Sequence, residues 1–191
     1  MSKFQEILSF WFGQPEAANF GKSRKIWFAK NEEFDREIRS RFLTTYQQAV
    51  KKELDLWQNY PQNCLALIIV LDQFPRNMFR NTPQAFATDD LALKFAKNAV
   101  DRSFDRELLP VQRWFMYLPF EHSENLESQK RSLELFNCLE NNSENKQAIA
   151  SAQRHYKIIE QFGRFPHRNQ ILGRESTAAE IEFLKTPGSS F

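Results

Sequence analysis

The sequence has only five glycines among its 191 residues. Phosphate-binding loops and dinucleotide-binding turns need closely spaced glycines, and neither pattern is present. We therefore expect no cofactor. Cysteine is also scarce, because Cys64 and Cys138 are the only two and do not form a CxxC pair. Both fall in helical runs, where they are expected to be small buried residues in a reducing compartment.

Long apolar runs are missing as well. No stretch approaches the ~20 apolar residues that a membrane-spanning helix needs, and the N-terminus lacks the basic and apolar regions of a signal peptide. The formal net charge of +2 is too small to indicate nucleic acid by itself. We expect a cytoplasmic protein without a membrane or nucleic-acid partner, and its oligomeric state stays open.

Aromatic residues are abundant, at 14% of the chain and with nineteen phenylalanines. They supply bulk for packing helices against one another. Apolar residues recur with a period near 3.6 and do not alternate as in strands, which predicts an all-α protein. We expect a single domain over residues 1–191 with a frayed tail from about residue 186. Antiparallel helical hairpins without a strict 34-residue repeat are the expected architecture.

Prolines, glycines and polar residues divide the chain into expected helices. Pro75 and Pro119 are expected to end two of them, because proline cannot continue a helix. Asn31 and Thr177 are expected N-caps, and Asp89 is expected to cap a third helix. The expected helices cover residues 4–12, 22–30, a segment after 31, 61–71, 89–100, 110–118, 125–139, 147–162 and a segment after 177, with loops at 140–146 and 163–174.

One phrase occurs twice in the sequence. Asp-Gln-Phe-Pro-Arg-Asn at 72–77 is echoed by Phe-Pro-His-Arg-Asn at 165–169, each after an apolar helical run. Taken singly, each copy is an ordinary helix end. Arginine is also well suited to gripping carboxylates and phosphates. If the two loops meet, four or five guanidinium groups converge, and Asp72 and Glu160 are their expected internal partners.

These loops predict a site for an anion. Trp114 is expected either to line its wall or to serve the core. The residues expected to bind the ligand are Asp72, Arg76, Asn77, Arg80, Trp114, Arg164, Arg168 and Asn169. A carboxylate-bearing peptide is the alternative ligand to a small anionic molecule.

A third segment holds candidate catalytic residues. His122 stands between Glu121 and Glu124, and a histidine beside carboxylates is suited to acid–base catalysis. The alternative is local: Ser123 caps the following helix, Glu124 lies in its first turn and His122 is an ordinary loop residue. His167 is a further catalytic candidate. The histidines lack i,i+4 pairing, so no metal site is expected.

Five segments, taken together and in order, resemble a known family. They imply the bacterial family labelled domain of unknown function 924, and the resemblance runs from about residue 4 to residue 184. It implies a helical fold of the tetratricopeptide-like superfamily and carries no established activity. The segments are Phe-Trp-Phe-Gly at 10–13, Leu-Asp-Gln-Phe-Pro-Arg-Asn at 71–77, Leu-Pro-Phe-Glu-His-Ser-Glu at 118–124, Gly-Arg-Phe-Pro-His-Arg-Asn at 163–169 and Leu-Gly-Arg-Glu-Ser-Thr at 172–177.

Three functions remain open from the sequence. The first is a binding module for an anionic small molecule or peptide. The second is an enzyme, a hydrolase or transferase acting on a phosphorylated or carboxylated metabolite with a His/Glu pair. The third is a structural adaptor whose polar motifs lock loops together. The spatial relation of Arg76, His122 and Arg168 distinguishes a site from separate surface features.

Overall fold

The computed structural model describes residues 1–18, 20–140 and 143–190, and every regular element in these ranges is helical. The prediction of an all-α protein is therefore confirmed. The α-helices are α1 (Lys3–Phe12), α2 (Glu32–Val50), α3 (Pro61–Ile68), α4 (Phe74–Met78), α5 (Asp89–Asp101), α6 (Pro110–Glu121), α7 (Leu126–Asn137), α8 (Ser143–Phe162) and α9 (Ala178–Leu184).

Short helical turns join these elements. One is a π-helix, η3 (Ile69–Gln73), and it connects α3 directly to α4. The others are the 3₁₀ turns η1 (Lys25–Trp27), η2 (Asp55–Asn59), η4 (Pro83–Phe86), η5 (Phe104–Glu107) and η6 (Pro166–Arg168).

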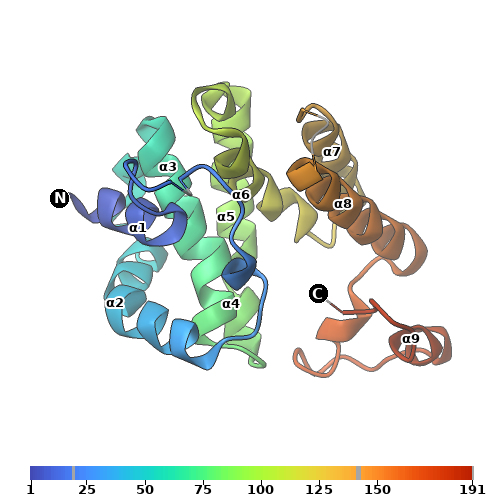
Figure 1. Cartoon of the computed structure of the whole chain (residues 1–191). Coiled ribbons are helices and arrows are strands. Elements are labelled where there is room, and N and C mark those ends of the chain that lie inside the picture. Colours follow the sequence, from blue (N-terminus) through green and yellow to red (C-terminus); the bar gives the residue numbers. More distant parts are fainter. Residues whose placement is uncertain (19, 141–142, 191) are drawn as a thin grey trace.

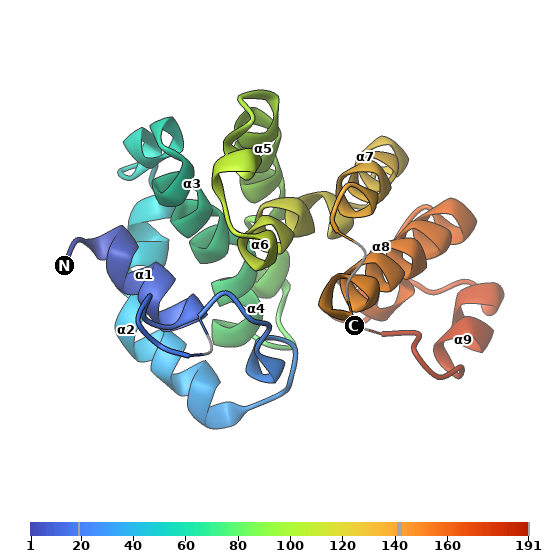
Figure 2. The same cartoon turned by 45° about the horizontal axis from the view of Figure 1, so that its top comes forward.

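The helices α1 to α6 form the larger part of the molecule (Figure 1). Helices α7 and α8 pack against each other, and α6 contacts both of them as well as α3 and α5. The chain then turns back through η6 to α9, which lies on the far side of α8 from the large part (Figure 2). Helix α6 therefore joins the two parts, and its C-terminal end points into the junction.

The core lies around α3 and η3. Every residue from Cys64 to Gln73 is buried. Aromatic rings from three other segments pack on this run: the indole of Trp11 stands edge-on to the rings of Phe74 and Phe115, at centroid distances of 5.6 and 5.5 Å. A second, small apolar cluster in the C-terminal part is built on Ile158, Ile159 and Phe165.

Two prolines do not end helices, contrary to expectation. Pro75 lies at the start of α4, which follows η3 without a break. Pro119 lies inside α6, which continues to Glu121. Proline lacks the N–H group that a helix uses in its interior, so each of these prolines removes one helical hydrogen bond. The missing bond at Pro75 is replaced by a tertiary contact, described with the site below.

Other boundaries also differ from the expectation. The expected helix at 22–30 is reduced to η1, in which Trp27 is buried. Phe28, directly after it, is 66% exposed. Helix α8 begins at Ser143, within the expected loop 140–146, of which 141–142 lie outside the described residues. Cys64 is buried as predicted, whereas Cys138 is exposed after the last turn of α7.

The caps divide in the same way. The side chains of Asn31 and Thr177 accept hydrogen bonds from the backbone N–H groups of Phe34 and Glu180, so both predicted caps are confirmed. Asp89 is instead the first residue of α5, after Thr88. The predicted cap Ser123 is replaced by Asn125 at the start of α7.

The structure tests several of the remaining expectations only in part. Within the described ranges, no helix is both long and apolar enough to cross a membrane. The tail expected to fray makes a turn in which the Ser189 hydroxyl donates to the Leu184 carbonyl, at 3.1 Å, and Phe191 lies outside the described residues. The single domain and the tetratricopeptide-like superhelix stay predictions.

Candidate functional site

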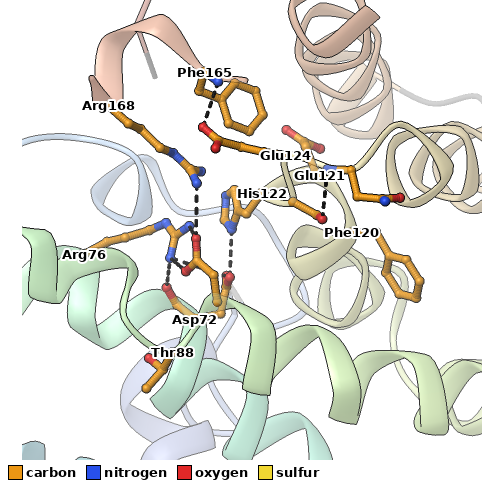
Figure 3. A network of polar contacts seen from close by, with 12 residues as sticks. Asp72, Arg76, Thr88, Phe120, Glu121, His122, Glu124, Phe165 and Arg168 are labelled. Carbon is orange, nitrogen blue, oxygen red and sulfur yellow. Dashed lines mark hydrogen bonds and ion pairs between the residues drawn. The ribbon is translucent and has the colours of Figure 1, made fainter. Parts of the chain in front are cut away.

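The three polar segments of the sequence meet at the junction between the two parts of the molecule (Figure 3). Asp72 comes from η3, Arg76 from α4, His122 from the residue after α6 and Arg168 from η6. Asp89, at the start of α5, contacts both arginines. We call these five residues the charged cluster. Arg76, His122 and Arg168 therefore lie together rather than on separate faces.

The π-helix places Asp72. A π-turn is rare and is frequent at functional sites, because it shifts the side chains that follow it around the helix. Pro75 has no N–H group to offer the carbonyl of Leu71, four residues earlier. The buried hydroxyl of Thr88 donates to that carbonyl at 2.6 Å instead. The contact also joins η3 to the residue that precedes Asp89.

The end of α6 places His122. The backbone N–H of His122 donates to the carbonyl of Leu118, at 2.8 Å. The buried amide of Gln129, from α7, donates to the carbonyls of Glu121 and Ser123 at 2.6 and 2.7 Å. These are carbonyls that the end of a helix leaves without partners. Gln129 therefore fixes the backbone on both sides of His122.

Asp72 and His122 form a close pair. Nδ1 of His122 lies 2.8 Å from Oδ1 of Asp72, which is fully buried. Burial alone would raise the pKa of the Asp72 carboxyl, but His122, Arg76 and a hydrogen bond from Gln73 together lower it below its usual value. Burial and the charge of Arg76 lower the pKa of His122, although Asp72 opposes this shift.

The tautomer of His122 follows from these directions. An ionised Asp72 only accepts hydrogen bonds, so Nδ1 of the neutral imidazole carries the proton and donates it to Asp72. Nε2 then has a free lone pair. Nε2 makes no hydrogen bond with the described residues, and 13% of the His122 side chain is exposed. The pair thus presents an oriented acceptor or base.

Two arginines share one carboxylate. Arg76 binds both oxygens of Asp89, at 2.8 and 2.9 Å, and also donates to the backbone carbonyl of Asp72 at 2.6 Å. Arg168 reaches Oδ2 of Asp89 at 3.3 Å. Burial would lower the pKa of Arg76, but Asp89 and Asp72 raise it. Arg76 is therefore fully compensated.

Arg168 is less well compensated. Its side chain is 8% exposed, and its guanidinium lies 4.6 Å from the ring centroid of Phe86 and 4.5 Å from that of Phe165. Burial, and then the charge of Arg76, lower the pKa of Arg168 to about 10. Its Nε is buried and has no hydrogen-bond partner among the described residues. A buried donor without a partner is costly, so Arg168 has capacity for one more acceptor.

Glu124 anchors the second copy of the phrase. Its carboxylate binds Arg174 at 2.6 and 2.9 Å and accepts the backbone N–H of Phe165 at 2.8 Å. Burial alone would raise its pKa, but these hydrogen bonds lower it. Glu124 is thus already engaged, and a catalytic role for it has no geometric support. Its partner Arg174 also donates to the side-chain oxygen of Asn169, at 3.0 Å.

A second buried carboxylate–histidine pair lies behind His122. Nδ1 of His155, from α8, is 2.9 Å from Oε1 of Glu121, which also accepts the hydroxyl of Ser151 at 2.9 Å. The rings of His155 and His122 are 6.3 Å apart. No group of three or more potential metal ligands is formed by the described residues.

Several predicted site residues lie elsewhere. Arg80 binds Asp35 at 2.8 and 2.9 Å, and Asn77 donates to the same carboxylate. Arg164 binds Glu180 rather than Glu160, at 2.6 and 2.7 Å. Glu160 accepts the Tyr156 hydroxyl on the surface, so the expectation that it pairs with the arginines is wrong.

The remaining candidates are buried around the cluster or away from it. The indole N–H of Trp114 donates to Asn145 at 2.8 Å, so Trp114 faces the start of α8 and not the cluster. His167 follows the buried Pro166, and burial and the charge of Arg168 lower its pKa to about 3. Asn169 is buried and donates to the Ser176 hydroxyl at 3.0 Å, which makes it a support for the loop.

Sequence reasoning missed Asp89 and Phe86 as members of the site. Asp89 was expected only as a helix cap, yet it is the shared partner of both arginines. Phe86 lies 5.6 Å from the Arg76 guanidinium and 4.6 Å from that of Arg168. The sequence offers one signal for Asp89: it is the first acidic residue after the first copy of the phrase, and it stands at the start of an expected helix.

Two surface hollows lie away from the cluster. One, of about 220 Å³, is lined by residues of α5, α6 and α7, including Lys97, Phe120 and Arg131. The other, of about 540 Å³, lies between α8 and α9 beside Arg164 and Glu180. Neither includes Arg76, His122 or Arg168. The charged cluster itself is mostly covered, since the side chains of Arg76, His122 and Arg168 are 20, 13 and 8% exposed.

The fold and the cluster define an all-helical protein with a buried Asp–His pair beside paired arginines. Residues 7–188 match the family model described as "Bacterial protein of unknown function (DUF924)", and the chain belongs to this family. It is similar to the solved structure of a protein of unknown function, ATU0120, from Agrobacterium tumefaciens. The identity is 38%, the match covers 95% of this chain and 96% of that one, and the TM-score is 0.84. No curated protein matches this chain.

Proposed function

We propose that this protein binds a small anionic molecule at the charged cluster, with Arg168 and His122 as its main contacts. The observation that carries the proposal is the incomplete pairing of the buried Arg168 guanidinium. This guanidinium lies 3.3 Å from the carboxylate of Asp89, which it shares with Arg76. Its Nε has no hydrogen-bond partner among the described residues. A bound carboxylate or phosphate oxygen supplies the missing acceptor.

The cover over the cluster limits the size of the ligand. The side chains of Arg76, His122 and Arg168 are 20, 13 and 8% exposed. A compact anion of a few atoms fits this cover, and so does the carboxylate end of a peptide whose remainder lies outside. The proposal favours the compact anion because these three side chains are mostly covered.

A binding experiment with matched variants tests this function. A panel of small organic acids and inorganic phosphate is titrated by calorimetry and by thermal shift against the wild type, Arg168→Gln and Arg80→Gln. We expect at least one acid to bind the wild type and Arg80→Gln equally, and to bind Arg168→Gln about tenfold more weakly or worse. Arg80 is the control because its guanidinium is paired with Asp35 outside the cluster.

The Asp72–His122 pair favours a second candidate, an acid–base enzyme. The pair fixes the ring of His122 with an unprotonated Nε2, as a general base requires. The test is turnover of any acid that binds, compared between the wild type and His122→Gln. Turnover that is lost while the affinity stays within about twofold supports catalysis. Binding without turnover in the wild type leaves the binding function alone.

A purely structural role makes the opposite prediction. In that case the cluster only holds the C-terminal part against α4 and α5. No acid or phosphate would then stabilise the wild type, and Arg168→Gln would only lower the free energy of unfolding. This outcome overturns the binding proposal.

A further inference from the structure

We infer that the ligand of the charged cluster is a small monocarboxylate with a hydroxyl or amino group next to its carboxylate. The inference rests on the proposed function and narrows it to a substrate class. Three features of the site carry it: the balance of charges, the two hydrogen-bonding groups that lack partners, and the aromatic walls.

The charges of the site balance before any ligand arrives. Arg76, Arg168 and Arg174 face three carboxylates, and each carboxylate contacts at least one of them. Arg76 and Arg168 share Asp89, Arg76 lies 3.6 Å from Asp72, and Arg174 binds Glu124. One added negative charge can lie against Arg168, whose contact to Asp89 is long, at 3.3 Å. Each further charge on the same ligand meets three nearby carboxylates and is repelled.

The aromatic residues around Arg168 strengthen the interactions between these charges. The rings of Phe86 and Phe165 lie within 4.6 Å of the Arg168 guanidinium, and Phe165 is fully buried. Apolar walls exclude water and lower the local dielectric constant, so that charges interact more strongly than on an open surface. An open basic patch favours polyanions. This cluster disfavours them.

The unsatisfied hydrogen-bonding groups specify the second part of the ligand. Nε of Arg168 is a donor that lacks an acceptor among the described residues. Nε2 of His122 is an acceptor, because Nδ1 donates its proton to Asp72. In Figure 3 the end of the Arg168 side chain and the ring of His122 lie beside each other, above the end of Arg76. A ligand that satisfies both groups offers a negative oxygen to Arg168 and an O–H or N–H to His122.

The test is a titration of the intact wild-type protein with small acids in matched pairs. Lactate is compared with propionate, from which it differs only in its hydroxyl group. Alanine is compared with propionate, from which it differs only in its amino group. Succinate, citrate, inorganic phosphate and ATP extend the series to higher charge. We expect the best ligands to be monocarboxylates with a donor, about tenfold tighter than their partners without one, and binding to weaken as charge rises.

Three outcomes would overturn the inference, and they differ in what they leave of the proposed function. If polyanions bind most tightly, or if the donor group makes no difference, the inference is wrong while anion binding stands. If no member of the series binds or raises the melting temperature, the proposed function itself fails. Binding that persists unchanged in Arg168→Gln places the ligand elsewhere and also overturns both.

A charge-changing variant tests the balance directly. Asp89→Asn adds one unit of positive charge to the cluster, so succinate and phosphate should gain affinity relative to the monocarboxylates, by about tenfold. Asp35→Asn is the matched control, since it releases Arg80 outside the cluster. If Asp89→Asn does not fold, Glu124→Gln makes the same change through Arg174. An unchanged order of preference in the folded variants contradicts the inference.

Discussion

At the scale of single residues, Arg76 shows how much of the cluster is held by internal pairing. Its guanidinium binds both oxygens of Asp89 and the backbone carbonyl of Asp72, and it packs against the ring of Phe86. An arginine in this position is a structural partner first. Arg168, with its longer contact to Asp89 and its unpartnered Nε, is the residue with spare capacity.

Arg76→Ala is therefore expected to destabilise the fold strongly. It leaves Asp72 and Asp89 as buried or half-buried carboxylates without their main cation, at a cost of about 3 kcal/mol in the free energy of unfolding. Urea titration measures this loss. Arg131→Ala is the control, because Arg131 and its partner Glu134 are exposed, and its change should stay within about 0.5 kcal/mol. A similarly small change for Arg76→Ala would contradict the pairing described here.

His167 gives the protein a defined acid sensitivity. Burial and Arg168 lower its pKa to about 3 in the folded state, whereas in the unfolded chain it titrates at about 6.5. The unfolded chain therefore binds more protons, and stability falls as the pH drops from about 6.5 toward 3. Most carboxylates titrate below pH 5, so the upper part of this window reports histidines.

His167→Asn should remove part of this dependence. Between pH 7.5 and pH 5 the wild type is expected to lose about 1–2 kcal/mol more of its free energy of unfolding than the variant. Urea titrations at the two pH values measure the difference. His122 contributes in the same direction, because its pKa is also lowered, so a smaller dependence remains in the variant. An identical pH dependence of both proteins would exclude this role of His167.

At the scale of elements, the passage from α3 through η3 to α4 depends on one side chain outside it. Pro75 has no N–H group to donate to the Leu71 carbonyl, and the Thr88 hydroxyl donates to that carbonyl at 2.6 Å. Thr88→Val keeps the shape of the side chain and removes the hydroxyl. We expect a loss of about 1–3 kcal/mol, because a buried carbonyl is left without a partner. Thr88→Ser should restore most of it in thermal unfolding.

The control is Thr82→Val, since the Thr82 hydroxyl also donates to a carbonyl but lies on an exposed turn. Its change should stay within about 0.5 kcal/mol. If Thr82→Val and Thr88→Val behave alike, the hydroxyl of Thr88 does not support the π-helix.

The sequence predicts elements well where the determining interaction is local. The caps at Asn31 and Thr177 use backbone groups within three residues, and both were predicted. The helix ends predicted at Pro75 and Pro119 are wrong, because a helix can continue past a proline where another donor takes the place of the missing N–H group. At Pro75 the substitute is Thr88, which is distant in sequence and adjacent in space. No local pattern contains that contact.

The site follows the same division. The doubled phrase and the segment around His122 indicated which segments could form a site, but the sequence left open whether they meet. The sequence did not predict which carboxylate serves each arginine: Asp89, Asp35 and Glu180 are the partners of Arg76, Arg80 and Arg164. Those pairings depend on how α2, α5 and α9 are placed, and placement is decided by packing of the whole chain.

At the scale of the whole molecule, the C-terminal part is attached beside the cluster through polar contacts. Glu124 accepts the Phe165 N–H and binds Arg174, and Arg168 reaches Asp89. Glu124→Ala should loosen residues 165–174 without unfolding α8. Hydrogen exchange measures this, and the Phe165 amide should exchange at least tenfold faster in the variant. The Gly163 amide is the internal control, because it donates to the Ile159 carbonyl of α8.

Equal acceleration at both amides would mean that the variant disturbs α8 itself. No acceleration at either would mean that Glu124 does not hold the segment. The expected pattern, faster exchange at Phe165 alone, makes the C-terminal segment a separately opening cover of the cluster.

The sharing of Asp89 has a consequence for descent. Arg76 and Arg168 are 92 positions apart in the chain, yet both form ion pairs with the carboxylate of Asp89. A change of Asp89 to a neutral residue leaves two guanidinium groups facing each other, and a later loss of either arginine relieves that conflict. The three positions are therefore expected to change together in evolution: a homologue that has lost Asp89 is expected to have lost Arg76 or Arg168 as well.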